Sequence, residues 1–189
     1  LFRLLLLPLI LMIGSCASVS ASGPVTSREP GFVIAANPLP ARAGMEVLER
    51  GGSAVDAAIA VQAMLSLVEP QSSGMGGGAF ITYYDGKTRE VTVYDGRETA
   101  PAQATAGMFL DGAGKPLPFD QAVLSGPATG VPGAVAMLAT AHREHGRLEW
   151  RTLFRSAERS ADEGFIISPR LGRLLAGDYA ENSAPDVVA

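Results

Sequence analysis

Five stretches of the chain carry the apolar spacing or the boundary signals of helices, and two shorter stretches alternate as strands do. The predicted helices span residues 41–50, 54–68, 131–145, 149–163 and 168–179. The second of them, AVDAAIAVQAMLSLV, is apolar nearly all round, and a helix of that kind is buried on every side. The sequence therefore predicts a central helix that neighbouring elements surround.

Residues with known capping behaviour mark the boundaries of this central helix. Ser53 precedes it and Asp56 lies three positions further on, which is the spacing of a capping box. The residue before Pro70 avoids the helical region, so the helix is expected to end there. The pair Gly51–Gly52 is expected to stop the preceding helix.

The strand-like stretches predict a hairpin and one further strand. Residues 79–84 and 90–94 alternate between apolar and polar side chains, and the turn signal Asp85-Gly86 lies between them. Residues 31–37 (GFVIAAN) are short, apolar and partly β-branched, which predicts a buried strand. Residues 102–130 show little periodicity and several prolines and glycines, so we expect a loop-rich connection there.

The chain begins with LFRLLLLPLILMI, which has the layout of a secretory signal peptide: one arginine, a short apolar run, and small residues after it. Two processing routes remain open. Cleavage after Ala21 follows the small-residue rule and discards Cys16, whereas a bacterial lipobox ending at Cys16 leaves that residue lipidated. Either route predicts an exported protein, in the periplasm or held at the membrane by a lipid anchor, with residues 22–30 as a polar tether.

Composition indicates one globular domain of ordinary size, with 189 residues that are 47% hydrophobic and 18% charged. The net charge of -4 argues against nucleic acid as a partner, because no basic face is visible. His142 and His145 are the only two histidines and share a helix face. Without further ligands they predict a solvated surface rather than a zinc site. No metal and no cofactor are expected.

Residues 74–79 (GMGGGA) match the dinucleotide-binding pattern G-x-G-x-x-A in letters only. That pattern must follow a strand and open a helix, whereas here a helix precedes it and a strand follows. We therefore interpret the stretch as a turn where backbone passes close to backbone or to substrate. The chain has no G-x-S-x-G motif, and no serine or cysteine has a persuasive histidine partner in the sequence.

Arg97 follows the second predicted strand and a glycine, between Asp95 and Glu98. Its planar guanidinium can hold a carboxylate through two parallel hydrogen bonds. A position at the end of a core strand would hold this side chain rigidly. Two interpretations remain open from the residues alone: a carboxylate-binding residue, or a structural salt bridge to a neighbouring acid.

Four motifs occur in a fixed order along the chain: GGSAVDAAIAV, VEPQSSGMGGGAF, YDGRETAP and TGVPGAV. Together they resemble the N-terminal part of the large subunit of γ-glutamyltransferases, over essentially all of residues 31–189. Parts of them also resemble cephalosporin acylases of the same superfamily. The resemblance implies an α+β fold of the N-terminal nucleophile hydrolase type, a four-layer αββα sandwich, of which this chain supplies the N-terminal portion. It also implies a precursor that cuts itself into a large and a small subunit.

The same resemblance implies a chemistry. Family members transfer the γ-glutamyl group of glutathione or a similar donor to water, an amino acid or a peptide through an acyl-enzyme. The nucleophile is the N-terminal threonine of the small subunit, so no catalytic residue is expected in this chain. The arginine of the D-x-R-E-x-A-P motif binds the donor's α-carboxylate, a role that falls on Arg97. Glu98 occupies the next motif position and is expected to support Arg97 or to line the pocket.

The chain departs from the family pattern in two ways. Residues 37–39 read Asn-Pro-Leu where many members have Asn-His-Pro-Leu, and the family precursor continues far beyond the length of this chain. We expect this chain alone to be inactive and poorly soluble or only partly folded, because missing strands leave sheet edges exposed. Two alternatives remain: a related acylase that acts on a glutaryl donor, and a truncated product without catalytic function.

Overall fold

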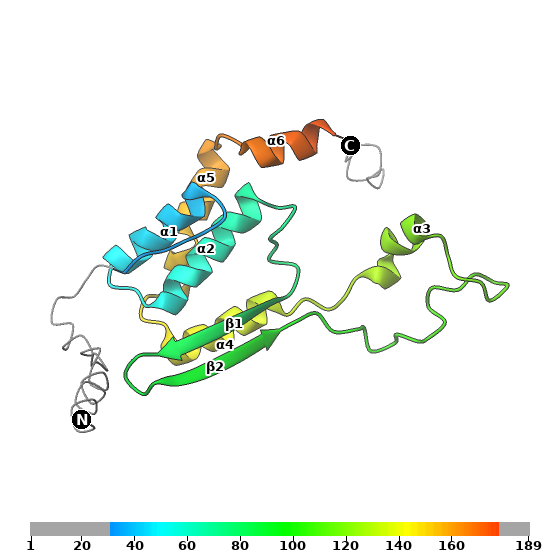
Figure 1. The fold of residues 1–189 in the computed structure, drawn as a ribbon, viewed down its shortest axis with the longest axis horizontal. Coiled ribbons are helices and arrows are strands. Elements are labelled where there is room, and N and C mark those ends of the chain that lie inside the picture. Colours follow the sequence, from blue (N-terminus) through cyan, green and yellow to red (C-terminus); the bar gives the residue numbers. More distant parts are fainter. Residues whose placement is uncertain (1–30, 178–189) are drawn as a thin grey trace, which may run out of the picture. The chain divides into compact units, whose positions relative to one another are not determined.

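The computed structural model describes residues 31–177, so the predicted leader, Cys16, the polar tether and residues 178–189 lie outside the described part. The elements run in the order α1 (Pro38–Glu49), α2 (Ala54–Val68), β1 (Ala79–Asp85), β2 (Glu90–Gly96), α3 (Phe119–Val123), the 3-10 helix η1 (Gly126–Ala128), α4 (Ala134–His145), the 3-10 helix η2 (Trp150–Leu153), α5 (Arg155–Glu163) and α6 (Pro169–Ala176) (Figure 1). This mixture of helices and strands agrees with the predicted α+β class. Within residues 31–177, no helix combines the length and the apolar character needed to cross a membrane.

Helices α1 and α2 pack side by side, and the predicted signals at their junction are present (Figure 1). The N–H groups of Gly51 and Gly52 both donate to carbonyls in the last turn of α1, at 2.9 Å. Gly51 has a φ of 86°, a backbone conformation that favours glycine. Ser53 and Asp56 form the predicted capping box through reciprocal hydrogen bonds between side chain and backbone. The predicted signals at the end of α1 and at the start of α2 are confirmed, but the predicted start of the first helix at residue 41 is wrong, because α1 begins at Pro38, with Pro38 and Pro40 inside its first turn.

Asp56 also connects the start of α2 to the segment that follows α4. Its side chain is fully buried, and its Oδ2 accepts the N–H of Arg147 at 2.9 Å and of Leu148 at 3.1 Å. Its Oδ1 lies 3.4 Å from Nε2 of His142. A buried carboxylate is tolerated where such donors replace its lost water. Asp56 therefore ties α2 to the chain behind α4.

Strands β1 and β2 form an antiparallel hairpin, as predicted, and each is longer than its apolar pattern indicated. Ile81 lies opposite Tyr94, and both face α4 and the core. The other face of the hairpin carries Phe80, Val91 and Val93, each about 60% exposed or more. The hairpin therefore has one packed face and one apolar face that no described element covers.

The predicted strand over residues 31–37 is wrong for the described structure, because these residues form neither helix nor strand. Phe32 and Ile34 are 81% and 84% exposed. Asn37 instead caps α1, where its Oδ1 accepts the N–H of Leu39 at 3.0 Å. An apolar, β-branched run becomes a strand only beside a partner that supplies backbone hydrogen bonds, and neither described strand pairs with this segment.

Two helix predictions also need correction. Helix α2 is not buried on every side, since Ala54 and Ala58 are exposed while Val55 and Ile59 are buried. Alanine counts as apolar in the sequence pattern, but it occurs on exposed and buried sides of helices alike, so it does not indicate which side is covered. The helix predicted over residues 149–163 is divided into η2 and α5, with Phe154 between them.

The later helices begin close to their predicted start signals. Helix α4 starts at Ala134, so that Pro132 lies just before the N-cap residue Gly133 rather than inside the first turn. Helix α6 starts at Pro169, and Ser168 caps it by accepting the N–H of Leu171 at 3.1 Å. Its predicted end near residue 179 falls outside the described residues.

The connection between β2 and α4 is loop-rich, as predicted, apart from the short helices α3 and η1. We call residues 102–130 the excursion. Figure 1 shows the excursion carrying α3 away from the packed helices. Three of its apolar side chains are largely exposed, Phe119 at 78%, Leu124 at 57% and Val123 at 51%. These residues contribute nothing to the described core.

Candidate functional site

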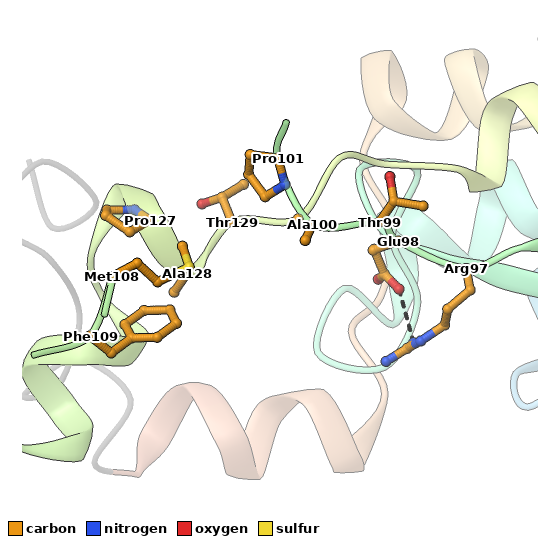
Figure 2. Close-up of a pocket in the computed structure, with 11 residues that line it drawn as sticks. Arg97, Glu98, Thr99, Ala100, Pro101, Met108, Phe109, Pro127, Ala128 and Thr129 are labelled. Carbon is orange, nitrogen blue, oxygen red and sulfur yellow. Dashed lines mark ion pairs between the residues drawn. The ribbon is translucent and has the colours of Figure 1, made fainter. Parts of the chain in front are cut away.

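Arg97 lies directly after β2 and forms an ion pair with Glu98, with 2.9 Å between Arg97 NH1 and Glu98 Oε2. Figure 2 shows the guanidinium turned toward this carboxylate. The Arg97 side chain is nevertheless 67% exposed. Asp95 fixes the backbone here, because its Oδ1 accepts the N–H of Arg97 at 2.8 Å. The structure thus contains the local salt bridge and still leaves much of the arginine open to a ligand.

Glycines hold the backbone of Glu98 closely on two sides. A Cβ at Gly78 would lie 2.9 Å from the Glu98 nitrogen, and a Cβ at Gly130 would lie 2.9 Å from the Glu98 Cβ. Thr99 and Val131 exchange backbone hydrogen bonds of 3.3 and 2.8 Å, which keeps the two segments together. The interpretation of residues 74–78 as a turn of close backbone approach is confirmed at Gly78.

The start of α4 packs against both the glycine turn and the end of β2. The Gly77 carbonyl accepts the N–H of Gly133 at 3.3 Å and of Ala134 at 3.1 Å. Gly133 in turn packs against the backbone of Gly96, where any added Cβ would overlap the Gly96 carbonyl. Three of the four motifs found in the sequence therefore meet around one arginine, and their glycines allow the approach.

The surroundings of Glu98 favour its ionised form. The pKa of its carboxyl is lowered first by a hydrogen bond from its own backbone N–H, and further by the Arg97 charge and the Gly78 N–H, while partial burial acts in the opposite direction. An ionised Glu98 keeps the Arg97 ion pair at neutral pH. This agrees with the supporting role expected for Glu98.

A cleft of about 420 Å³ begins at Arg97 and Glu98 and runs along Thr99 and Pro101 into the excursion. Its far end is formed by Met108, Phe109, Pro127 and Ala128, which lie together in Figure 2. Among the described residues that line it, none is a histidine, cysteine or lysine. The cleft therefore offers one cation and one apolar end, and sequence reasoning did not identify Met108 or Phe109, since an irregular loop has no period that indicates which residues converge.

A second hollow of about 400 Å³ lies on another side of Arg97. Its lining includes Tyr94, Asp95 and Thr140. Arg97 and Thr99 contribute to both hollows. Arg97 therefore borders two separate hollows.

The two histidines do not form the solvated surface that we predicted. His145 stacks on Tyr83 with 4.0 Å between ring centroids, and its Nε2 lies 2.8 Å from the Tyr94 hydroxyl. Tyr94 also donates to Glu144, and burial together with this carboxylate raises the pKa of Tyr94 to about 12. Within residues 31–177, no cluster of His, Cys, Asp and Glu side chains has the composition of a metal site.

A buried carboxylate that sequence reasoning missed anchors the start of the glycine turn. Glu69 is 3% exposed, and its oxygens accept from Asn37 Nδ2 at 2.9 Å and from Gln71 Nε2 at 2.6 Å. The Asn37 hydrogen bond is the main reason why the pKa of Glu69 is lowered. The available signal was a charged residue at the end of an apolar helix, but its partner lies 32 positions away.

Comparisons with known proteins agree with this geometry. The family model for gamma-glutamyltranspeptidase matches residues 40–186. The glutathione hydrolase proenzyme of Bacillus subtilis is 44% identical over 151 residues, which are 80% of this chain and 26% of the relative. The chain thus spans about a quarter of the length of that relative.

Solved structures give the same result. The γ-glutamyltranspeptidase of Helicobacter pylori superposes with a TM-score of 0.76 at 33% identity, over 84% of this chain and 45% of that one. A cephalosporin acylase from Bacillus halodurans superposes with a TM-score of 0.64 at 29% identity, over 84% of this chain and 30% of that one. The sequence motifs, the glycines packed against the backbone around Arg97 and Glu98, and these matches lead to one conclusion: the chain belongs to the gamma-glutamyltranspeptidase family, which is a family of enzymes.

Proposed function

We propose that this chain is the N-terminal part of a γ-glutamyltransferase and glutathione hydrolase. The observation that carries the proposal is Arg97, which is exposed at a cleft and oriented by Glu98 and Asp95. A planar guanidinium in that position suits the α-carboxylate of a γ-glutamyl donor such as glutathione. Glu98 occupies one terminal nitrogen of Arg97, so the remaining donors of the fork face the substrate.

The reaction itself needs a nucleophile outside this chain. In the proposed mechanism, a threonine at the N-terminus of a small subunit attacks the γ-carbonyl carbon of the donor. The new C–O ester bond replaces the C–N amide bond, and the proton of the hydroxyl passes to the leaving amine. Water, an amino acid or a peptide then attacks the ester and regenerates the threonine. Arg97 acts by binding and orientation alone.

The small subunit of the same precursor is the proposed partner. The open face of the hairpin, with Phe80, Val91 and Val93, and the exposed segment around Phe32 and Ile34 are consistent with strands and helices added by the rest of a four-layer αββα sandwich. The chain alone would then be poorly soluble and inactive. We further propose export to the periplasm, with the leader removed after Ala21 or Cys16 lipidated.

The binding role of Arg97 is tested by substitution in the complete protein that carries this segment. Arg97→Lys keeps the charge but loses the fork, so the KM for a γ-glutamyl anilide should rise at least about tenfold with self-cleavage intact. Arg151→Lys, at an exposed position outside both hollows, is the matched control and should leave KM unchanged. An unchanged KM in Arg97→Lys would remove Arg97 from the site.

A related acylase is the second candidate, favoured by the structural match to a cephalosporin acylase. Both donor types end in a carboxylate, so Arg97 serves either. A glutaryl donor lacks the α-amino group, and parallel assays of γ-glutamyl and glutaryl anilides separate the two activities. If the complete protein hydrolyses neither anilide, the remaining alternative of a non-catalytic product is favoured.

A further inference from the structure

We propose that the apolar end of the cleft binds the amine side of the substrate, and that it selects apolar or aromatic groups there. This inference rests on the proposed function. The amine side is the leaving group of the donor and, because acyl transfer to an amine is the reverse of its release, also the side chain of an acceptor amine. Phe109 and Met108 are the specificity-determining residues.

The two ends of this cleft differ in chemistry. Arg97 stands at one end, and Met108, Phe109 and Pro127 form the other (Figure 2). The size of about 420 Å³ lies within the range of small-molecule sites. Such a cleft suits a molecule with an anionic head and an apolar tail.

Backbone hydrogen bonds fix the apolar end, although it belongs to an irregular loop. The N–H of Met108 donates to the Thr105 carbonyl at 3.2 Å, and the Phe109 carbonyl accepts the N–H of Leu117 at 2.9 Å. Both side chains are half-buried, whereas Phe119 in the same excursion is 78% exposed. The excursion thus holds two apolar side chains at the cleft and leaves others outside it.

The covalent structure of the donor determines which end meets which group. In a γ-glutamyl amide, the α-carboxylate and the amine side lie at opposite ends of the glutamyl chain. A donor anchored at Arg97 therefore directs its amine side away from the guanidinium. The second hollow mixes Asp95 and Thr140 with apolar residues such as Met137, whereas the far end of the cleft presents the side chains of Met108 and Phe109. An aromatic amine loses more water-exposed apolar surface in the cleft.

The test compares two donors in the complete protein, γ-glutamyl anilide and γ-glutamyl methylamide. Phe109→Ala should lower kcat/KM for the anilide about tenfold and change the methylamide value less than about twofold. Phe109→Leu keeps an apolar side chain and should lose less than about threefold. Phe119→Ala is the matched control and should leave the ratio of the two donors unchanged. Self-cleavage and a thermal melt confirm that each variant folds, and Met108→Ala repeats the comparison if Phe109→Ala folds poorly.

An equal loss for both donors, no loss for either, or the same loss in Phe119→Ala would overturn the proposal. The Arg97→Lys result separates this failure from failure of the proposed function, because that variant should impair both donors alike. A strong effect of Arg97→Lys with an unchanged donor ratio in Phe109→Ala rejects the apolar subsite alone. An unchanged KM in Arg97→Lys rejects the carboxylate anchor on which the subsite depends.

Discussion

The packed region around α2 and the excursion of residues 102–130 differ in how far their apolar side chains are buried. Around α2, the side chains of Ile59, Val68 and Leu153 are almost completely buried by neighbouring elements. In the excursion, Phe119 and Leu124 remain largely exposed. The first region therefore buries its apolar side chains within the described structure, whereas the second leaves apolar surface that no described element covers. Arg97 lies where these two regions join.

The largest expected effect contrasts two carboxylates that accept backbone N–H groups. Asp56 is fully buried in the packed region, and Asp111 accepts the N–H groups of Ala113 and Lys115 at 2.9 and 2.8 Å in the exposed excursion. Asp56→Ala leaves buried donors without a partner and should lower the free energy of unfolding by about 3 kcal/mol or more. Asp111→Ala should cost about 0.5 kcal/mol, because water replaces the lost acceptor.

Urea unfolding of the complete protein, followed by tryptophan fluorescence, measures the free energy of unfolding of both variants. Trp150 lies in the packed region beside His142 and reports on it. Comparable losses in the two variants would contradict the contrast between the regions.

The next effect concerns the junction of the two regions. Gly78→Ala places a Cβ where it overlaps Glu98, so Arg97 loses its fixed orientation. We expect kcat/KM for a γ-glutamyl anilide to fall at least about tenfold, since small displacements of a binding group are costly. Gly76→Ala is the matched control, because nothing lies within 4 Å of a Cβ at that position. If both variants retain full activity, close packing at Gly78 has no role in the site.

A smaller effect depends on pH and belongs to the packed region. Tyr94 has a pKa raised to about 12 in the folded chain, against 10.0 for an ordinary tyrosine. Unfolded chains therefore release this proton first, and the stabilisation that is complete below pH 10 is lost as the pH rises toward 12. The variant Tyr94→Phe lacks the phenolic proton and therefore lacks this pH-dependent stabilisation. The difference in urea midpoint between the wild type and Tyr94→Phe should shrink over that interval, and a constant difference would argue against the shift.

The smallest effect is expected in the excursion itself. Leu124→Ser removes an exposed apolar side chain and should reduce light scattering by the isolated chain, because less apolar surface remains for association. Unchanged scattering would contradict this expectation. In the complete protein, urea unfolding measures the cost of the same substitution. A loss of more than about 0.5 kcal/mol in the free energy of unfolding would mean that a partner covers Leu124, and a smaller loss would mean that Leu124 stays exposed.

The sequence predicted what depends on near neighbours in the chain. The capping box of Ser53 and Asp56, the stop at Gly51 and the hairpin around residues 85–90 all follow from residues within a few positions of each other. The motif around Arg97 also predicted a carboxylate-binding residue, and the roles of Arg97 and Glu98 remain predictions.

What the sequence did not predict depends on distant partners. The strand over residues 31–37 failed because no described strand pairs with it, and the solvated histidines failed because Tyr83 and Tyr94 come from another element. The pair of Asn37 and Glu69 has no local pattern at all. The apolar end of the cleft was likewise invisible, because Met108 and Phe109 acquire their neighbours only through the course of the loop.

The hydrogen bonds from Gly133 and Ala134 to the Gly77 carbonyl imply an order of events during folding. The α1–α2 pair involves residues close in sequence and can form early. The backbone around Arg97 reaches its final arrangement only when the start of α4 packs against it. Arg97 thus depends for its position on residues that follow it by more than 30 places in the chain.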